Sequence, residues 1–247
     1  MGRDLRVIFI KLADRVHNVQ TLHFHPKEEK RRRIALETMK IYVPIAQRLG
    51  LSHFQTLLEN GSFKILNPQE FDRIYSFLKK KFPQADVIIK RGIQKLTQLF
   101  EKEGFKEFEI KGRIKSPYRV WKKMQKYKTD NPAKILDIIA FRIILPDVPS
   151  CYAALGIIHQ HYIPLLNKIK DYISLPKPNG YRSLHTTVLG FFSYPVEFQI
   201  RTFEMDQIAE YGVAAHFAYK EADRSVSVSE KQAHWIQKLQ EIVKKYQ

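Results

Sequence analysis

The side chains best suited to chemistry lie in a loop rich in proline and glycine and in the strand that follows it. Residues 170–187 read KDYISLPKPNGYRSLHTT. Pro176, Pro178 and Gly180 exclude a helix here, and the β-branched residues after the loop predict a strand over 184–189. Lysines supply positive charge for phosphates, and a tyrosine ring offers a face on which a base stacks. The stretch suits a nucleotide pocket, although a polar turn at a sheet edge has a similar composition.

A strand near residue 200 carries a second group of candidate side chains. Alternation along 195–202 (PVEFQIRT) turns the apolar residues to one face and Glu197, Gln199 and Arg201 to the other. A carboxylate beside an amide and a guanidinium suits phosphoryl chemistry, which needs a base close to positive charge. A half-exposed amphipathic strand is the alternative that requires no function.

A basic motif precedes these stretches. Residues 112–117 (GRIKSP) follow a strand predicted over 105–110, and they lead into a helix because Ser116 is a favourable N-cap and Pro117 a favourable first helical residue. That helix turns several lysines outward or toward a ligand. Helices are also predicted over 205–220 and 230–246.

A buried strand with charged residues is predicted over 137–145 (DIIAFRIIL). Strict alternation puts Asp137 and Arg142 on opposite faces of that strand. The two side chains can share a site only if the strand contains a bulge or if Asp137 precedes the regular pleat.

The composition limits the class of partner. The chain has 247 residues, enough for one large domain or two modest ones, and a formal net charge of +17. This charge implies an anionic partner, be it nucleotide phosphates, RNA or an acidic surface. A single cysteine, Cys151, excludes an intramolecular disulfide and fits a reducing cytoplasm. No apolar run is long enough to span a membrane, so we expect a cytoplasmic protein without a membrane partner.

Four of these motifs together resemble the RelA/SpoT family, the bacterial alarmone synthetases and hydrolases. They are Lys-Asp-Tyr-Ile…Pro-Lys-Pro-Asn-Gly-Tyr-x-Ser-Leu-His-Thr-Thr, Gly-Arg-x-Lys, Asp-x-x-Ala-x-Arg and Val-Glu-x-Gln-Ile-Arg-Thr. The resemblance implies transfer of pyrophosphate from ATP to the 3′-hydroxyl of GDP or GTP, the alarmone synthesis of the stringent response. It also implies an α+β, nucleotidyltransferase-like fold, with a mixed five-stranded sheet flanked by helices. The chain has no Gly-x-x-x-x-Gly-Lys-Ser/Thr loop, so side chains must hold the phosphates.

The resemblance also implies roles on the ATP side. Arg113 and Arg142 would sandwich the adenine, and Lys115 and Lys123 would hold the ATP phosphates. The chain departs from the family pattern at Arg119, where the family usually has a serine that can reach a phosphate. The role of that position is therefore open.

The metal and the acceptor are assigned in the same way. Asp137 and Glu197 would hold Mg²⁺, and Glu197 would accept the proton of the guanosine 3′-hydroxyl. Tyr181 would stack on guanine, and Asn179 would shape its loop. The GDP or GTP phosphates and ribose would meet three further side chains, Lys170, Lys177 and His185.

The N-terminal region resembles the end of the family's hydrolase domain. Residues 11–18 (KLADRVHN) match its last motif, in which the aspartate, here Asp14, completes a manganese site. A divalent ion needs several ligands, and the spacing of His17, His23 and His25 does not match the others. Asp14 is therefore not expected to bind a metal alone. We expect a fragment of a longer protein without hydrolase activity, and Mn²⁺-dependent release of pyrophosphate from ppGpp would contradict that.

The predicted domain organisation follows from these matches. Residues 1–27 are the remnant of an all-α HD-type hydrolase domain, and 28–82 a helical connector in which Pro44 should kink or split a helix. Residues 83–222 are the synthetase domain, and 223–247 a linker and final helix.

Two other functions remain open from the sequence. The first is a hydrolase-lineage protein whose synthetase site has decayed, leaving a structural or regulatory role, and Arg119 is the departure that favours it. The second is a basic RNA-binding module, suggested by the net charge of +17. ATP and GDP or GTP are the expected partners, and contact with the ribosome or RNA would use C-terminal regions of a longer protein. The sequence does not indicate an oligomeric state.

Overall fold

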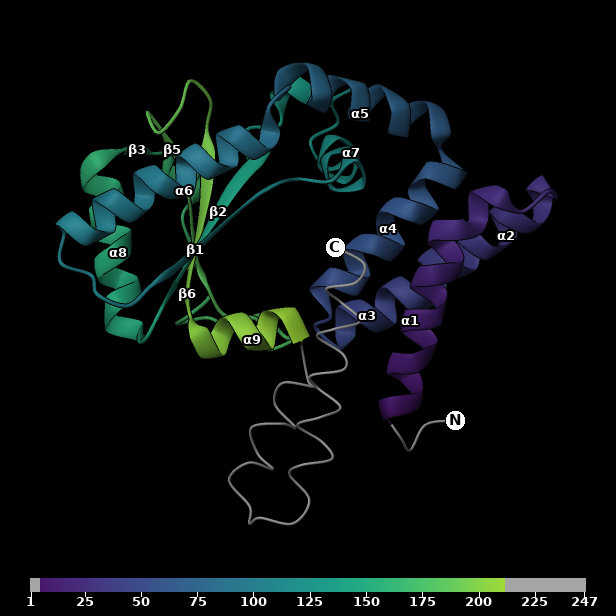
Figure 1. Ribbon diagram of the computed structural model, residues 1–247, viewed down its shortest axis with the longest axis horizontal. Helices are drawn as coiled ribbons and strands as arrows, with labels where there is room; N and C mark the ends of the chain where they lie inside the picture. The colour runs from purple at the N-terminus through teal and green to yellow at the C-terminus, as the bar shows by residue number, and fades with distance from the viewer. Residues whose placement is uncertain (1–4, 212–247) are drawn as a thin grey trace, which may run out of the picture. The chain divides into compact units, whose positions relative to one another are not determined.

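The computed structural model describes residues 5–211 of the chain (Figure 1). They form two compact units, one of residues 60–206 and one of residues up to 59 together with those after 206. The predicted linker and final helix after residue 222 lie outside the described residues. No helix within 5–211 has the length and apolar character needed to cross a bilayer.

The first unit is helical. Its elements are α1 (Leu5–Thr21), η1 (Leu22–Phe24), α2 (Glu28–Glu37), η2 (Thr38–Tyr42), α3 (Val43–Arg48) and the start of α4 (Ser52–Leu66). The break predicted near Pro44 is present, since η2 is a π-helical turn directly before it. A proline has no N–H to continue the α-helical pattern, and a π-turn accommodates that loss. The apolar stripe of α1 forms the core, through Phe9, Leu12, Val16 and Val19.

A mixed sheet organises the second unit. Its strands are β1 (Glu109–Ile114), β2 (Ile139–Leu145), β3 (Ile163–Pro164), β4 (Lys170–Asp171), β5 (Leu184–Leu189) and β6 (Val196–Thr202). The order β1-β2-β6-β5-β3 makes a path of five strands, and the two-residue strand β4 pairs with β5 beside it. Strands β2 and β6 are parallel, whereas the other pairs are antiparallel. The predicted α+β fold with a mixed sheet is confirmed, with β4 as an additional short strand.

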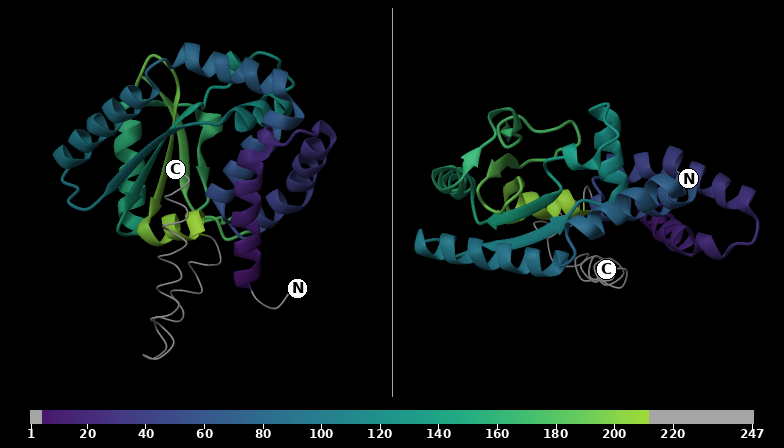
Figure 2. Two further views of the ribbon diagram at one scale, coloured as in Figure 1. Left: turned by 45° about the vertical axis from the view of Figure 1, so that its right-hand side comes forward. Right: turned by 90° about the horizontal axis from the view of Figure 1, so that it is seen from above.

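Helices cover one face of this sheet. The second unit contains α5 (Pro68–Lys81), α6 (Ala85–Lys102), α7 (Pro117–Lys126), α8 (Val148–His161), the short η3 (Pro132–Lys134) and η4 (Leu166–Lys168), and the start of α9 (Phe203–Tyr211). Both views of Figure 2 show α6, in blue, running beside the sheet. Gly92 of α6 abuts Phe141 of β2, and His159 of α8 lies 2.8 Å from the Thr186 hydroxyl of β5. Phe141 and Thr186 share the apolar face, so α6 and α8 both pack on it.

The first long strand is displaced from its predicted position. The sequence predicts a strand over 105–110, but β1 runs from Glu109 to Ile114. The rings of Phe105 and Phe108 instead pack on Phe100 of α6, with centroids 5.0 and 5.8 Å away. The Gly-Arg-x-Lys motif therefore begins inside the sheet, where Gly112 leaves room for the ring of Phe141.

The close approach of α6 to the sheet gives a test of the core. A Cβ built on Gly92 would lie 2.1 Å from Cζ of Phe141, a fully buried ring. Gly92→Ala is expected to lower the free energy of unfolding of this unit by about 1–3 kcal/mol, which exceeds the helix propensity gained. Gly156→Ala is the matched control, because Gly156 is a helical glycine with no atom within 4 Å of its built Cβ. It should keep or raise the stability, and equal changes in the two denaturation curves would contradict this packing.

Candidate active site

The polar face of the sheet carries four of the predicted site residues, namely Arg113, Arg142, Glu197 and His185. Alternation and register place them in two rows across the strands. One row runs from Arg113 of β1 through Ala140 to Glu197 of β6 and Thr187 of β5, and the other, two residues along, consists of Lys111, Arg142, Gln199 and His185. A charged face of this kind is available for a ligand because the apolar face already provides the core.

Lys115 lies at the centre of the candidate site. It follows β1, and its backbone N–H donates to the carbonyl of Ile138 at 2.8 Å. Its Nζ lies 3.0 Å from Glu197 Oε2 and 3.3 Å from Asp137 Oδ2, and it also donates to the Asp137 carbonyl at 2.6 Å. The Lys115 side chain is only 9% exposed. One buried ammonium therefore holds together the two carboxylates that the resemblance assigns to magnesium.

Asp137 reaches this position because it precedes the strand. Strand β2 begins at Ile139, so the alternation that would separate Asp137 from Arg142 does not yet apply. Of the two arrangements considered from the sequence, the one without a bulge is found. The Asp137 carboxylate also contacts Nζ of Lys123 on α7, which brings the helix that follows the basic motif to the same site.

Burial and neighbouring charges shift the pKa of Glu197 in opposite directions. Desolvation raises the pKa of its carboxyl, but the hydrogen bond and charge of His185 and the charge of Lys115 outweigh it, and the pKa is lowered. The carboxylate is therefore ionised at neutral pH and can accept a proton. Desolvation lowers the pKa of Lys115 by more than the Glu197 carboxylate raises it, so the pKa of Lys115 is below its ordinary value.

The loop before β5, which we call the acceptor loop (residues 172–183), leads to the Glu197 carboxylate through His185. The Tyr181 hydroxyl lies 2.8 Å from Nε2 of His185, whose Nδ1 lies 3.3 Å from Oε1 of Glu197. Lys177 Nζ lies 4.7 Å from the centroid of the Tyr181 ring. Asn179 Oδ1 accepts a hydrogen bond from the Tyr181 N–H at 3.3 Å, so this side chain contacts the backbone of the turn. Gly180 has φ +78°, a value that favours glycine.

Further lysines surround the contact between Lys123 and Asp137. Desolvation, and then the charge of Lys115, lower the pKa of Lys123 to about 7, with smaller contributions from Lys168 and Lys170. The charge of the Glu197 carboxylate raises the pKa of Lys123 and so acts in the opposite direction. Lys170 is exposed on β4, opposite His185 of β5, and so lies at the rim of the site. This accumulation of positive charge suits a polyphosphate ligand.

The two arginines expected to hold adenine come from adjacent strands. Desolvation, followed by the charges of Arg142 and Arg119, lowers the pKa of Arg113. Arg113 nevertheless keeps exposed surface. Nη1 of Arg142 lies 3.0 Å from Oδ1 of Asp206. Three guanidinium groups thus share one region of the polar face.

Two polar residues at this site were not among the predicted ones. Asp206, in the first turn of α9, pairs with Arg142 and Arg201. The ring of Tyr172 stands edge-on to Tyr181 and to His185, with centroids 6.2 and 5.3 Å away. Tyr172 lies in the Lys-Asp-Tyr-Ile motif, which was a usable signal, whereas nothing local to Asp206 indicates its partners.

The predicted metal residue of the first unit, Asp14, lies on α1. Asp14 is exposed, and its Oδ2 accepts a hydrogen bond from Asn18 at 3.0 Å. Within residues 5–211, no group of three or more histidine, cysteine, aspartate or glutamate side chains could hold a metal ion.

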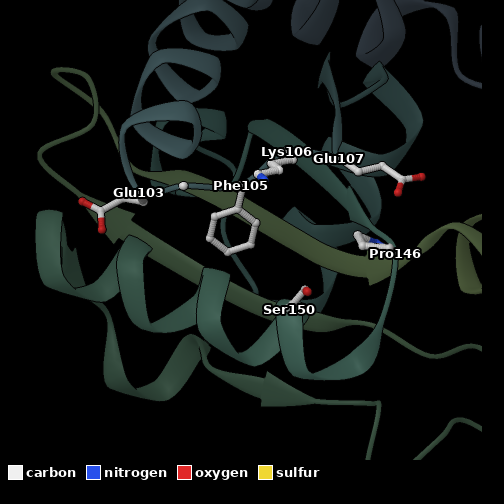
Figure 3. A pocket seen from close by; sticks show the side chains of 7 residues that line it. Glu103, Phe105, Lys106, Glu107, Pro146 and Ser150 are labelled. Carbon is white, nitrogen blue, oxygen red and sulfur yellow. The ribbon is translucent and has the colours of Figure 1, made fainter.

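A separate hollow of about 330 Å³ opens at the opposite end of β2 (Figure 3). It is lined by residues 103–107, Pro146 and Ser150. None of the predicted site residues lines it, so the candidate site is defined by the side chains around Lys115.

Comparison with known proteins identifies the family. Residues 112–224 match the family model described as a region found in RelA / SpoT proteins, and residues 1–52 match an HD domain. The chain belongs to the RelA/SpoT family. The first match contains the site residues from Arg113 to Asp206, and the second contains Asp14.

Two curated relatives span almost the whole chain. A GTP pyrophosphokinase of Myxococcus xanthus is 45% identical over 241 residues, which cover 98% of this chain and 31% of that protein. The bifunctional (p)ppGpp synthase/hydrolase SpoT of Escherichia coli K12 is 42% identical over 243 residues, or 98% of this chain and 34% of SpoT. The chain thus spans about a third of the length of these relatives. The crystal structure of the small alarmone synthetase 1 from Bacillus subtilis superposes with a TM-score of 0.46 at 22% identity, over 71% of this chain and 98% of that one.

The histidine between the loop and Glu197 gives a pH-dependent test. Burial lowers the pKa of His185 below its ordinary value of 6.5, although Glu197 raises it. As pH falls below about 6.5 the unfolded chain binds the proton first, so this group makes the free energy of unfolding fall with pH. His185→Gln should therefore lose less stability than the wild type between about pH 7.5 and pH 5.5, by about 1 kcal/mol.

The dependence of unfolding on pH is measured by denaturant titration of the wild type and of His185→Gln. A His185→Gln slope equal to that of the wild type would contradict the buried, neutral state of His185.

Proposed function

We propose that this chain is a pyrophosphokinase that transfers the β,γ-pyrophosphate of ATP to the 3′-hydroxyl of GDP or GTP. The bond from the 3′-oxygen to the β-phosphorus forms, the bond from the β-phosphorus to the oxygen of the α-phosphate breaks, and AMP leaves. The products are ppGpp or pppGpp. The observation that carries the proposal is that Lys115 joins Asp137 and Glu197 while the acceptor loop reaches the same Glu197 through His185.

The donor side is argued from the cations around Lys115. Lys115 and Lys123 are paired with carboxylates in the structure, and in the proposed mechanism both would turn to the phosphates of ATP. Their charge would then stabilise the negative charge that develops on the leaving phosphate. Arg113 and Arg142, from neighbouring strands, offer planar guanidinium faces to the adenine.

The two carboxylates fit a magnesium ion. Mg²⁺ is bound in such enzymes by one or two carboxylates together with substrate phosphates, and Asp137 and Glu197 both lie within 3.3 Å of one Lys115 Nζ. The Nζ of Lys115 already lies between them, which supports binding of positive charge by the pair. When bound, Mg²⁺ would neutralise charge on the β- and γ-phosphates of ATP.

The acceptor side is argued from the loop before β5. Tyr181 presents a ring for guanine to stack on, and Lys177 and Lys170 are exposed cations for the guanosine phosphates. His185 lies between Tyr181 and Glu197 and would meet the ribose or phosphates. Glu197, ionised at neutral pH, would accept the proton of the attacking 3′-hydroxyl.

The names of the relatives agree with this reaction. One relative is named a GTP pyrophosphokinase and another a bifunctional (p)ppGpp synthase/hydrolase. The four synthetase motifs lie within residues 112–202, inside the match to the RelA/SpoT region. Because relatives also carry hydrolase names, the products of this chain must be measured directly.

Replacing the proposed base tests the chemical step. Glu197→Gln keeps the size of the side chain and removes the proton acceptor, so turnover should fall by about a hundredfold or more. Binding of ATP and of GDP or GTP, measured by calorimetry, should remain. Glu107→Gln, at an exposed acid of the same unit, is the control and should keep wild-type turnover. Near-normal turnover by Glu197→Gln would remove Glu197 from this role.

Replacing the tyrosine tests the acceptor pocket. Tyr181→Ala should raise the Michaelis constant for GDP or GTP by about tenfold, since base stacking is worth about 1–3 kcal/mol, and change that for ATP less. Tyr181→Phe keeps the ring and loses only the contact with His185. Its Michaelis constant for GDP or GTP should therefore stay closer to that of the wild type. Equal changes in the Michaelis constants for ATP and for GDP or GTP in Tyr181→Ala would contradict stacking on guanine.

A further inference from the structure

Asp206 brings one carboxylate to three cations on the polar face of the sheet. Its Oδ1 lies 3.0 Å from Nη1 of Arg142 and accepts a hydrogen bond from Nε of Arg201 at 2.8 Å. Its Oδ2 lies 3.6 Å from Nζ of Lys111. The side chains of Asp206 and Arg201 are 10% and 1% exposed. A buried charge of this kind is costly unless it is paired, so these contacts are held firmly.

The contacts restrict the orientation of two guanidinium groups. The N–H groups of arginine point outward in the plane of the group, so a partner at the edge of the group does not itself stack on the faces. Asp206 meets Arg142 and Arg201 through these edge nitrogens. It therefore orients each guanidinium without occupying the surface that a ring would use.

The two arginines lie near different parts of the proposed site, Arg142 near the ATP contacts and Arg201 near the contacts for GDP or GTP. Arg142 is a proposed adenine contact, next to Arg113 on the polar face. The guanidinium carbon of Arg201 lies 5.8 Å from the ring centroid of Tyr181, the proposed guanine contact. We propose that Asp206 is a positioning residue that holds the guanidinium plane of Arg142 for adenine and that of Arg201 beside Tyr181. The inference rests on the proposed function, because it concerns how that site recognises ATP.

Removing the Asp206 carboxylate has two opposite effects on the affinity for ATP. Asp206→Asn adds net positive charge to the site, which favours any polyphosphate. It also releases the plane of Arg142, which weakens only a ligand that carries adenine. The two effects are separated by comparing α,β-methylene-ATP, which cannot be cleaved at the reacting bond, with inorganic tripolyphosphate.

The experiment measures dissociation constants for both probes by calorimetry on the full chain. For Asp206→Asn, the affinity for α,β-methylene-ATP should fall about three- to tenfold relative to that for tripolyphosphate, the cost of reordering one or two side chains. Asp206→Glu keeps the charge and should recover part of the ratio. The ratio is independent of the fraction of folded protein, because unfolding removes both ligands' sites equally.

Glu109→Gln is the matched control. Glu109 is an acid on the same face of β1 and pairs with the same Lys111, at 3.2 Å, but its side chain is 49% exposed. Its ratio of affinities should equal that of the wild type. An unchanged ratio in Asp206→Asn would overturn the positioning role while ATP binding by the wild type stands. A wild type that does not bind α,β-methylene-ATP would instead contradict the proposed function and the inference with it.

Discussion

The ammonium of Lys115, shared between Asp137 and Glu197, is the interaction on which the candidate site depends. The two carboxylates lie within 3.3 Å of the same Nζ, and without that buried cation their negative charges would repel each other strongly in a protein interior. The arrangement needs three separate parts of the sheet region, namely the residue after β1, the second residue before β2 and the start of β6. In the proposed mechanism the same ammonium binds ATP phosphates, so nucleotide binding and release of the carboxylates are coupled.

The surrounding cations are not an arrangement that favours stability. Arg142 and Arg119 lower the pKa of Arg113 in addition to its desolvation, and Lys115 does the same to Lys123. Groups that repel one another in the free protein gain from a polyanionic ligand, which is typical of functional sites. Arg119, the position where the family usually has serine, adds to this field rather than weakening it, which argues against a decayed site.

The sequence contained the alternating patterns but not the contacts between distant elements. The two faces of β6 and the loop before β5 followed from residue types alone, and Asp137 required only that the strand begin two residues later. The position of β1 was wrong because Phe108 and Ile110 alternate with charged residues as in a strand, yet Phe105 and Phe108 pack on Phe100 from a loop. The role of Asp206 was not accessible, since its partners on β1, β2 and β6 come together only in the folded sheet.

The most direct test of the account is the product of the wild-type protein. Purified chain would be mixed with ATP, Mg²⁺ and either GDP or GTP, and the nucleotides separated by anion-exchange chromatography. The account predicts that AMP appears in step with ppGpp from GDP or pppGpp from GTP. Absence of these products while both nucleotides bind would contradict it.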